Sequence, residues 1–300
     1  MFAFPLDQMV GGIFYEHSHR MIASFVGFLT IILAIWIWKR DDRKWMRVLG
    51  FVALGAVITQ GLLGGLTVLF MLPTAISVSH ATLAQSFFAL VCAIALFTSR
   101  WWKTESVAIR LEEQDRPLMT LALVTTFAVF IQLILGALMR HTQSGLAVPD
   151  FPLAYGQIFP SLSSDALTRY NEQLIRSEVR LAADGPINQM QIIIHMIHRF
   201  WAIVVGGMIL WIFVRMRKLD QAPSRLKKLS WTLLTLLLVQ IGLGAVTVLS
   251  QKAVDITTAH VASGALLLAT CVVMTFSCVK LFGVRFHESA VAFSPKGATA

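Results

Sequence analysis

Seven long apolar runs divide this chain of 300 residues and leave few folds open to it. Each is roughly 18 residues or longer, enough for a helix to cross the hydrocarbon core of a bilayer. Hydrophobic residues make up 56% of the chain and charged residues 14%, more apolar surface than a soluble domain of this size could cover. Lipid admits only helices and closed barrels, and continuous apolar runs indicate helices. We therefore expect an all-α integral membrane protein, with helices at about 21–38, 48–70, 76–99, 117–139, 193–214, 230–249 and 257–281.

The distribution of Lys and Arg predicts the orientation. Of the 25 basic residues, 18 fall in the segments 39–47, 100–116, 215–228 and 280–300. Cytoplasmic loops carry an excess of basic residues, so these segments should be cytoplasmic. The segments 1–18, 70–76, 141–191 and 250–256 should then lie on the outer side. This bias accounts for the net charge of +9, and no nucleic-acid partner is expected.

Two parts of the chain repeat one pattern: a His-Arg pair, a Gln-x3-Gly-x2-Thr-Val-Leu motif, and a second histidine. The first copy has His19-Arg20, Gln60 to Leu69 and His80, and the second has His198-Arg199, Gln240 to Leu249 and His260. The two histidines are 61 residues apart in the first copy and 62 in the second. Four predicted helices separate equivalent points, so the copies should have the same orientation, as parallel repeats about an axis along the membrane normal.

The repeat predicts two four-helix bundles, an N-terminal repeat over 1–116 and a C-terminal repeat over 117–300 that includes the outer loop 141–191. The predicted helix 117–139 precedes the second copy, and it carries a third Gln-x3-Gly motif, Gln132 to Gly136. No such helix precedes the first copy. Because Phe4-Pro5-Leu6 repeats Phe151-Pro152-Leu153, we expect that an equivalent first helix is missing from this chain.

The four repeated histidines are the best candidates for chemistry. A single histidine in a membrane helix is usually explained by a hydrogen bond to another helix. Four at repeated spacing and at one depth favour paired ligands instead. Two imidazoles from facing helices can bind a haem iron on both faces. A non-haem metal is disfavoured, because no carboxylate or cysteine cluster accompanies either pair.

Several polar residues surround these ligands in the sequence. Arg20 and Arg199 could each pair with a haem propionate, or could simply extend to the membrane surface. Glu16 lies three residues before His19, whereas the matching position before His198 is His195. A carboxylate at one site alone favours catalysis there over two equal electron-transfer haems, although an ordinary interfacial Glu remains the alternative. His195 is a possible outer partner of its ligand. Gln60 and Gln240 are expected to hydrogen-bond between helices, next to glycines that permit close approach.

The outer segment 141–191 is longer than a connector needs to be. Residues 164–182 are predicted to form an amphipathic helix, capped by Ser164 or Asp165. Its apolar face would consist of Leu167, Tyr170, Leu174 and Leu181. Such a helix could cover a haem edge or could lie in the membrane interface.

Taken together, these motifs resemble the haem A synthases over nearly the whole chain. The most specific matches are Glu16-His17-Ser18-His19-Arg20, the partner His80, the pair His198 and His260, and the loop from Arg140 to Pro152. The resemblance implies eight helices in two four-helix halves, in a bacterial cytoplasmic membrane, with both haem sites near the outer face. It implies a haem b cofactor on His198 and His260, and haem O as substrate on His19 and His80. The reaction would oxidise a methyl group of haem O to a formyl group, assisted by Glu16, to give haem A for cytochrome oxidase.

The resemblance further implies a haem O synthase and cytochrome oxidase assembly proteins as partners, and possible homo-oligomers. One departure is Val148, which stands where many bacterial members have an outer-loop cysteine, so a disulfide redox step is not expected. The main alternative is a dihaem b-type electron carrier. It explains the histidines but not Glu16, and it would normally carry haems near both membrane faces. A haem transporter or chaperone is a further alternative, which would need a polar route through the helices.

Overall fold

The structure is a computed structural model that describes residues 12–71, 73–104, 116–179, 185–219 and 222–282. Within these ranges, seven helices are long and apolar enough to cross a membrane. This confirms the prediction of an all-α integral membrane protein. They are α1 (Gly12–Arg40), α2 (Lys44–Leu69), α3 (Thr74–Thr98), α5 (Arg116–His141), α7 (Gln189–Lys218), α8 (Ser224–Leu249) and α9 (Val254–Phe282).

All seven of these helices begin before the predicted apolar runs. The clearest case is α1, predicted from about residue 21, which already includes Glu16 and His19. Helix α7 likewise begins at Gln189, where Asn188 and Gln191 form a capping box. The extra turns contain polar residues that hydropathy does not count. At α7 this capping box satisfies backbone N–H groups of the added first turn, so the helix can begin before the apolar run.

Contacts divide the chain into two units, Met1–Ile94 and Ala95–Ala300. In the second unit, α5, α7, α8 and α9 form a closed four-helix ring in which α5 contacts α7 and α9, and α8 contacts the same two helices. In the first unit, α1 packs along α2. The division of function between repeats 1–116 and 117–300 stays a prediction.

The second unit is held by close packing and by a few buried polar contacts. Ile209 of α7, Leu233 of α8 and Met274 of α9 are buried inside the ring. The hydroxyl groups of Thr126 and Thr275 lie 2.9 Å apart and join α5 to α9. Large apolar side chains such as Trp211 point outward and are exposed, as expected for lipid-facing positions. In lipid, helix association rests on such packing and on interhelical hydrogen bonds rather than on the hydrophobic effect.

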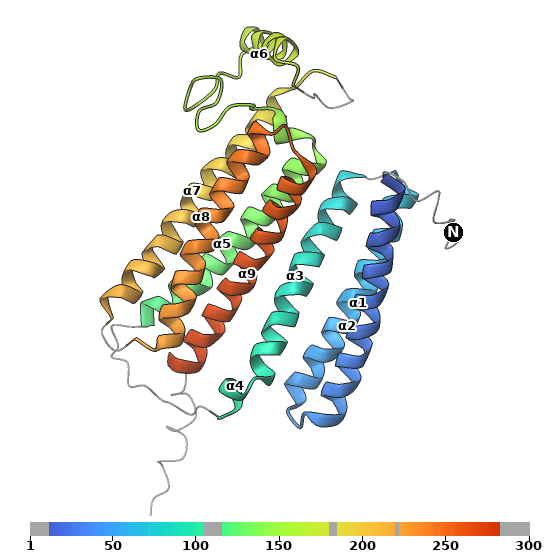
Figure 1. The fold of residues 1–300 in the computed structure, drawn as a ribbon, viewed down its shortest axis with the longest axis vertical. Helices are drawn as coiled ribbons and strands as arrows, with labels where there is room; N and C mark the ends of the chain where they lie inside the picture. Colours follow the sequence, from blue (N-terminus) through green and yellow to red (C-terminus); the bar gives the residue numbers. More distant parts are fainter. Residues whose placement is uncertain (1–11, 72, 105–115, 180–184, 220–221, 283–300) are drawn as a thin grey trace, which may run out of the picture. The chain divides into compact units, whose positions relative to one another are not determined.

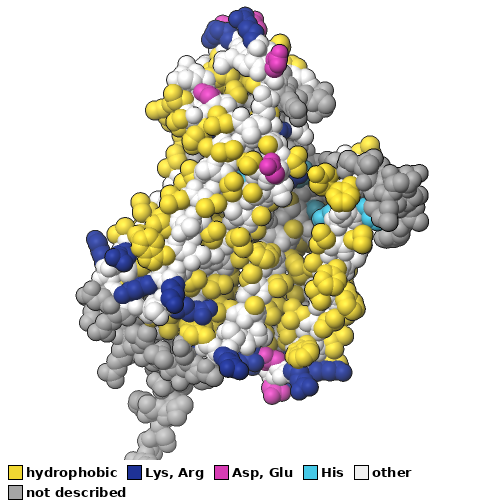
Figure 2. Space-filling view, viewed as in Figure 1, with side chains coloured by type: hydrophobic (Ala, Val, Ile, Leu, Met, Phe, Trp, Pro, Cys, Tyr) yellow, Lys and Arg dark blue, Asp and Glu magenta, His cyan; other side chains and the backbone are white. Residues whose placement is uncertain are grey.

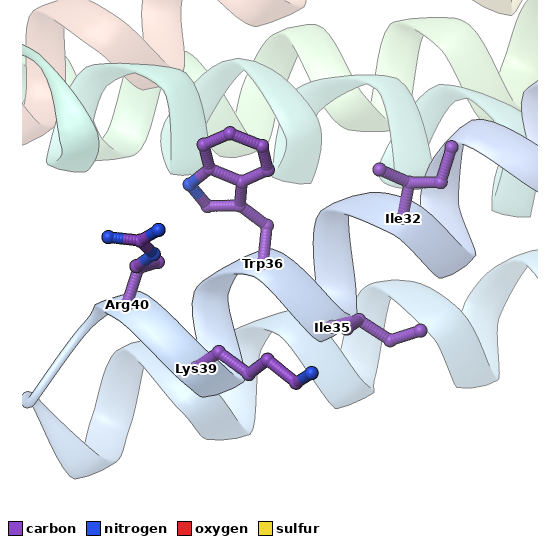
Figure 3. A pocket seen from close by; sticks show the side chains of 5 residues that line it. All are labelled: Ile32, Ile35, Trp36, Lys39 and Arg40. Carbon is purple, nitrogen blue, oxygen red and sulfur yellow. The ribbon is translucent and has the colours of Figure 1, made fainter.

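Basic residues gather near the helix ends, and hydrophobic side chains cover the helix shafts on the face shown in Figure 2. At the end of α1, a shallow pocket of about 310 Å³ is lined by Ile32, Ile35, Trp36, Lys39 and Arg40. The five side chains labelled in Figure 3 come from successive turns of α1 and share one face of the helix. An interfacial Trp next to basic residues is typical of a cytoplasmic membrane boundary. This pocket is remote from His19, which lies in the first turns of the same helix.

In Figure 1, helix α6 (Ser164–Arg176) lies beyond the ends of α5, α7, α8 and α9. It is shorter than the predicted range 164–182, because a turn follows at Ser177 and Glu178. The expected caps Ser164 and Asp165 are also wrong. The cap is Ser163, whose hydroxyl accepts a hydrogen bond from the Ala166 backbone N–H, and the helix begins one residue later.

The apolar face of α6 packs on the loop before it. Ala166, Tyr170 and Leu174 are buried in a cluster with loop residues Ala147 and Val148, and Leu167 packs against its edge. Leu181, the fourth predicted member of this face, lies outside the described residues. The cluster holds α6 and the loop together as one cap over the second unit.

Candidate functional site

His260 of α9 lies directly against the backbone of α8. A β-carbon added to Gly244 would be 3.1 Å from the ring Cε1 atom and 3.7 Å from Nδ1. One helical turn away, Gln240 Nε2 lies 3.5 Å from His260 Nε2. Ser263 donates a hydrogen bond to the Oε1 atom of the same glutamine, which orients its amide. The missing side chain of glycine therefore makes room for the ring, and the glutamine amide is directed at its outer nitrogen.

His80 of α3 repeats this geometry against α2. The β-carbon position of Gly64 is 3.1 Å from Cε1 and 3.7 Å from Nδ1 of His80. Gln60 Nε2 lies 3.4 Å from His80 Nε2. The two copies thus agree in atomic contacts as well as in sequence.

His198 of α7 uses the third Gln-x3-Gly motif, on α5. The β-carbon position of Gly136 is 3.2 Å from the Cε1 atom of His198. Gln132 Nε2 lies 3.2 Å from His198 Nε2 and 3.1 Å from the backbone oxygen of the same residue. The sequence shows this motif on the predicted helix 117–139, but no ligand was expected to face Gln132 and Gly136. The signal for this contact was present in the sequence, because the same Gln-x3-Gly motif faces His80 and His260.

The histidines are arranged as pairs. His198 and His260 lie close enough to interact electrostatically, and so do His19 and His80. Within the described residues, no three His, Cys, Asp or Glu side chains come together as a metal cluster. The two pairs differ in exposure, because His19 is exposed and the other three rings are partly buried.

The ring nitrogens fit a metal ligand. A glutamine NH2 group donates, so the Nε2 atom of His80 or His260 accepts with its lone pair, and the same lone pair would bind iron in place of this contact. The contacts of 3.4 and 3.5 Å are long for hydrogen bonds, so they hold the rings only weakly. The Nδ1 atoms of both histidines are buried and find no hydrogen-bond partner among the described residues. Such rings are under-satisfied as ordinary interhelical histidines and suited to ligation.

Glu16 and Arg20 form an ion pair on α1. The Nη2 atom of Arg20 lies 2.6 Å from the Oε1 atom of Glu16, and both side chains are substantially exposed. Their spacing of four residues puts both side chains on one face of the helix. Arg20 is therefore bonded to the neighbouring carboxylate, and the propionate contact expected for it stays a prediction.

Arg199 binds the backbone of the outer loop. Its Nη1 atom donates to the carbonyl oxygen of Leu153 at 2.9 Å. Its Nη2 atom donates to the carbonyl oxygens of Asp150 at 2.7 Å and Val148 at 3.2 Å. The guanidinium that the sequence assigned to a propionate thus has three protein partners, each about fifty residues away along the chain.

His195 and Gln191 extend this contact along α7. His195 is buried, and its Nδ1 donates to the carbonyl oxygen of Ser144 at 2.9 Å. Gln191 Nε2 donates to the carbonyl oxygen of Thr142 at 3.2 Å. Because Gln191, His195 and Arg199 are four residues apart, they lie on one face of the helix, and we refer to them as the loop-binding stripe. His195 therefore has a structural role in holding the loop. This role explains why a histidine stands before His198 where Glu16 stands before His19, and it needs no catalytic function for His195.

The loop is also ordered internally. Asp150 accepts hydrogen bonds from the backbone N–H groups of Tyr155 at 2.8 Å and Gly156 at 3.0 Å. The Tyr155 hydroxyl donates to the carbonyl oxygen of Ala147 at 2.8 Å, and its ring stacks on Tyr170 at 3.7 Å. Burial, and then the charge of Asp150, raise the pKa of Tyr155 well above its ordinary value. The hydroxyl therefore stays protonated and keeps its donor role over the physiological range.

Comparison with known proteins gives consistent matches. The family described as "Cytochrome oxidase assembly protein" matches residues 1–272. The chain is similar to the heme A synthase of Alkalihalophilus pseudofirmus, with 30% identity over 161 residues, 53% of each chain. It is similar to that of Halalkalibacterium halodurans, with 32% identity over 149 residues, 49% of each chain. With the heme A synthase of Shewanella oneidensis, identity is 28% over 263 residues, 87% of this chain and 75% of that protein. The chain spans about half the length of the first two relatives.

Proposed function

Because the chain belongs to the cytochrome oxidase assembly protein family, we propose that it is a haem A synthase acting on haem O in the membrane. The observation that carries this proposal is a repeated contact between two helices. In each case a histidine ring packs against a glycine of the facing helix, and a glutamine amide one turn away lies next to a ring nitrogen. This contact occurs at His80, His198 and His260. Two relatives that align over 87% and 89% of this chain are heme A synthases.

We infer different roles for the two histidine pairs. His198 and His260 would hold a haem b cofactor, whose iron supplies redox chemistry when bound. His19 and His80 would hold the substrate, haem O. The greater exposure of His19 suits a substrate that must enter and leave, and the loop that covers the second unit suits a cofactor that stays.

The reaction would convert one ring methyl of haem O to a formyl group. Each of two hydroxylations removes two electrons from the same carbon, and these electrons pass to an external oxidant. The resulting geminal diol loses water to leave the aldehyde. Glu16 is the residue that we assign to proton transfer or to stabilising positive charge at that methyl. Its bond to Arg20 holds the carboxylate one helical turn from His19.

The setting of this reaction follows from the charge distribution. The basic segments would lie in the cytoplasm of a bacterium, and both histidine pairs would lie near the outer face. A haem O synthase would supply the substrate, and cytochrome oxidase assembly would use the product. This scheme does not require the chain to form homo-oligomers.

The alternative is a dihaem b-type electron carrier. It is favoured by the near-equal contacts of His80 and His260, which differ by only 0.1 Å in their glutamine distances. A carrier would leave haem O unchanged, whereas the synthase would convert it.

The deciding experiment is haem analysis by reversed-phase chromatography. The chain is co-expressed with a haem O synthase in a host that lacks haem A, and the haems are extracted. We expect haem A or its hydroxymethyl precursor. Haem O and haem b alone, from protein that binds haem, would refute the synthase and favour the carrier.

Two variants test the assigned residues. Glu16→Gln should retain haem binding and lose conversion, while Glu172→Gln is the matched control, since Glu172 also pairs with an arginine four residues on. Normal conversion by Glu16→Gln would remove Glu16 from the mechanism. His260→Ala should lose the tightly held b-type spectrum, and persistence of that spectrum would refute the cofactor assignment.

A further inference from the structure

Two cations lie together at the end of the second unit where α5 and α8 end and where α7 and α9 begin. Arg140 is in the last turn of α5, and Lys252 is in the turn between α8 and α9. The Lys252 Nζ atom donates to Gln143 Oε1 at 3.5 Å, and its Cδ atom is 3.3 Å from the β-carbon position of Gly145. The side chain of Lys252 is therefore folded over the start of the outer loop, towards the end of α5.

Arg140 and Lys252 have no compensating carboxylate among the described residues. In the part of the chain that the structure describes, neither forms an ion pair with Asp or Glu. Partial burial, and then the charge of Arg140, lower the pKa of Lys252. Two cations that disfavour each other are stabilised by an anion placed between them.

The position of these cations relative to the ligands is fixed by the helices. Gly136 touches His198, and Arg140 follows it on the same face of α5, about 6 Å further along the helix axis. Gly244 touches His260, and Lys252 lies beyond the end of α8 in the same direction. Both cations are thus on the same side of the histidine pair, just beyond its two rings.

The residue first expected to bind an anion here is already occupied. Arg199 donates to the carbonyl oxygens of Val148, Asp150 and Leu153, and it holds the loop in place. The other copy of the repeat lacks the lysine, because Leu72 stands 180 residues before Lys252. A cation at this position is therefore a property of the second pair alone.

We propose that Arg140 and Lys252 bind the two propionate carboxylates of a haem held between His198 and His260. The proposal rests on the haem ligation inferred under the proposed function. Haem carries both carboxylates on one edge, and an iron bound by the histidine pair would let that edge face the two cations. Arginine can bind a carboxylate with two N–H groups, and lysine acts as a point charge. Gln143 would help to position Lys252.

The test uses the full chain, produced in haem-deficient cells and titrated with haemin and with haemin dimethyl ester. Binding is measured by Soret absorbance for the wild type, Lys252→Met, Arg140→Gln and the double variant. The wild type should prefer the free acid, and each single variant should bind it roughly tenfold more weakly. Affinity for the ester should hardly change. Lys228→Met, an exposed lysine at the other end of α8, is the matched control.

Further variants separate the possible failures. Lys252→Arg should restore most of the preference for the free acid, which a merely misfolded variant would not. If the double variant prefers the free acid over the ester as strongly as the wild type does, the cation assignment is refuted. The His260→Ala variant then tests separately whether haem binds at the histidine pair. If the single substitution His260→Ala does not weaken haemin binding, His260 is not a haem ligand and the proposed ligation is wrong. If inorganic phosphate or anionic lipid competes equally with acid and ester, the cations bind a headgroup and the assignment also fails.

Discussion

The contact between Gly244 and His260 allows a prediction in which binding and stability change in opposite directions. In Gly244→Ala, the new β-carbon would lie 3.1 Å from the Cε1 atom of His260, and it would also approach both ring nitrogens. Ordinary contacts begin at 3.4 Å, so the ring must withdraw by a few tenths of an ångström. Because His260 is fixed to α9, this shift would move the imidazole away from the position in which it would bind iron.

We expect haem b to bind about tenfold more weakly, at the lower end of the effect seen when groups that orient a metal ligand are changed. That loss corresponds to about 1.4 kcal/mol. In the same variant, alanine replaces glycine inside a helix, which stabilises the haem-free protein by up to about 1 kcal/mol if the empty site lets the His260 ring withdraw without strain. Soret titration should therefore show weaker binding, while thermal unfolding of the haem-free chain shows an equal or higher midpoint.

The matched control is Gly242→Ala, where nothing lies within 4 Å of the new β-carbon. It should gain the same helix stabilisation and leave haem binding unchanged. The first pair offers a parallel test, in which Gly64→Ala weakens substrate binding and Gly65→Ala does not, because only Gly64 faces a histidine. Equal affinity of Gly244→Ala and Gly242→Ala for haem would refute the assignment of His260 as a ligand positioned by α8.

Two further predictions concern the outer loop. Burial and Asp150 raise the pKa of Tyr155 above 10.0, so its bond to Ala147 contributes stability that is complete below pH 10 and is lost as pH rises through the higher pKa of the folded state. Absorbance at 295 nm should show one late-ionising tyrosine that Tyr155→Phe removes; an unchanged titration would contradict this. Arg199→Lys should expose the loop to proteolysis roughly tenfold faster, since lysine cannot reproduce the planar contacts to three carbonyls, and equal rates for this variant and the wild type would contradict the anchoring role.

Much of the fold could be predicted from the sequence, because a bilayer makes hydrophobic length a reliable signal. The seven predicted spans correspond to the seven long helices of the described residues. The sequence repeat also recurs in the structure, where His80 and His260 face equivalent Gln-x3-Gly motifs. The ends were less predictable. The turn of α1 that contains Glu16 is polar, and the choice of Ser163 as cap depends on a backbone angle rather than on residue type.

The partners of Arg199 and His195 could not be predicted for a different reason. Both side chains bind main-chain carbonyls 46 to 51 residues away, and a carbonyl leaves no mark in the sequence. Arg199 was expected to bind a propionate because it follows His198 directly. That position is equally compatible with binding to the carbonyl groups of the outer loop, so the sequence alone does not separate the two partners. The contact between Gln132 and His198 could have been predicted, since the motif of Gln132 is the same as those that face the other two histidines.

The loop-binding stripe also has an evolutionary consequence. Since Arg199 and His195 bind main-chain oxygens, the anchor does not specify which side chains the loop carries. Exposed positions such as Leu153 are then free to diverge, whereas the length and path of the backbone between Ser144 and Leu153 are not. Among relatives that keep the histidine and the arginine of α7, this segment should vary in its amino acids and resist insertions and deletions.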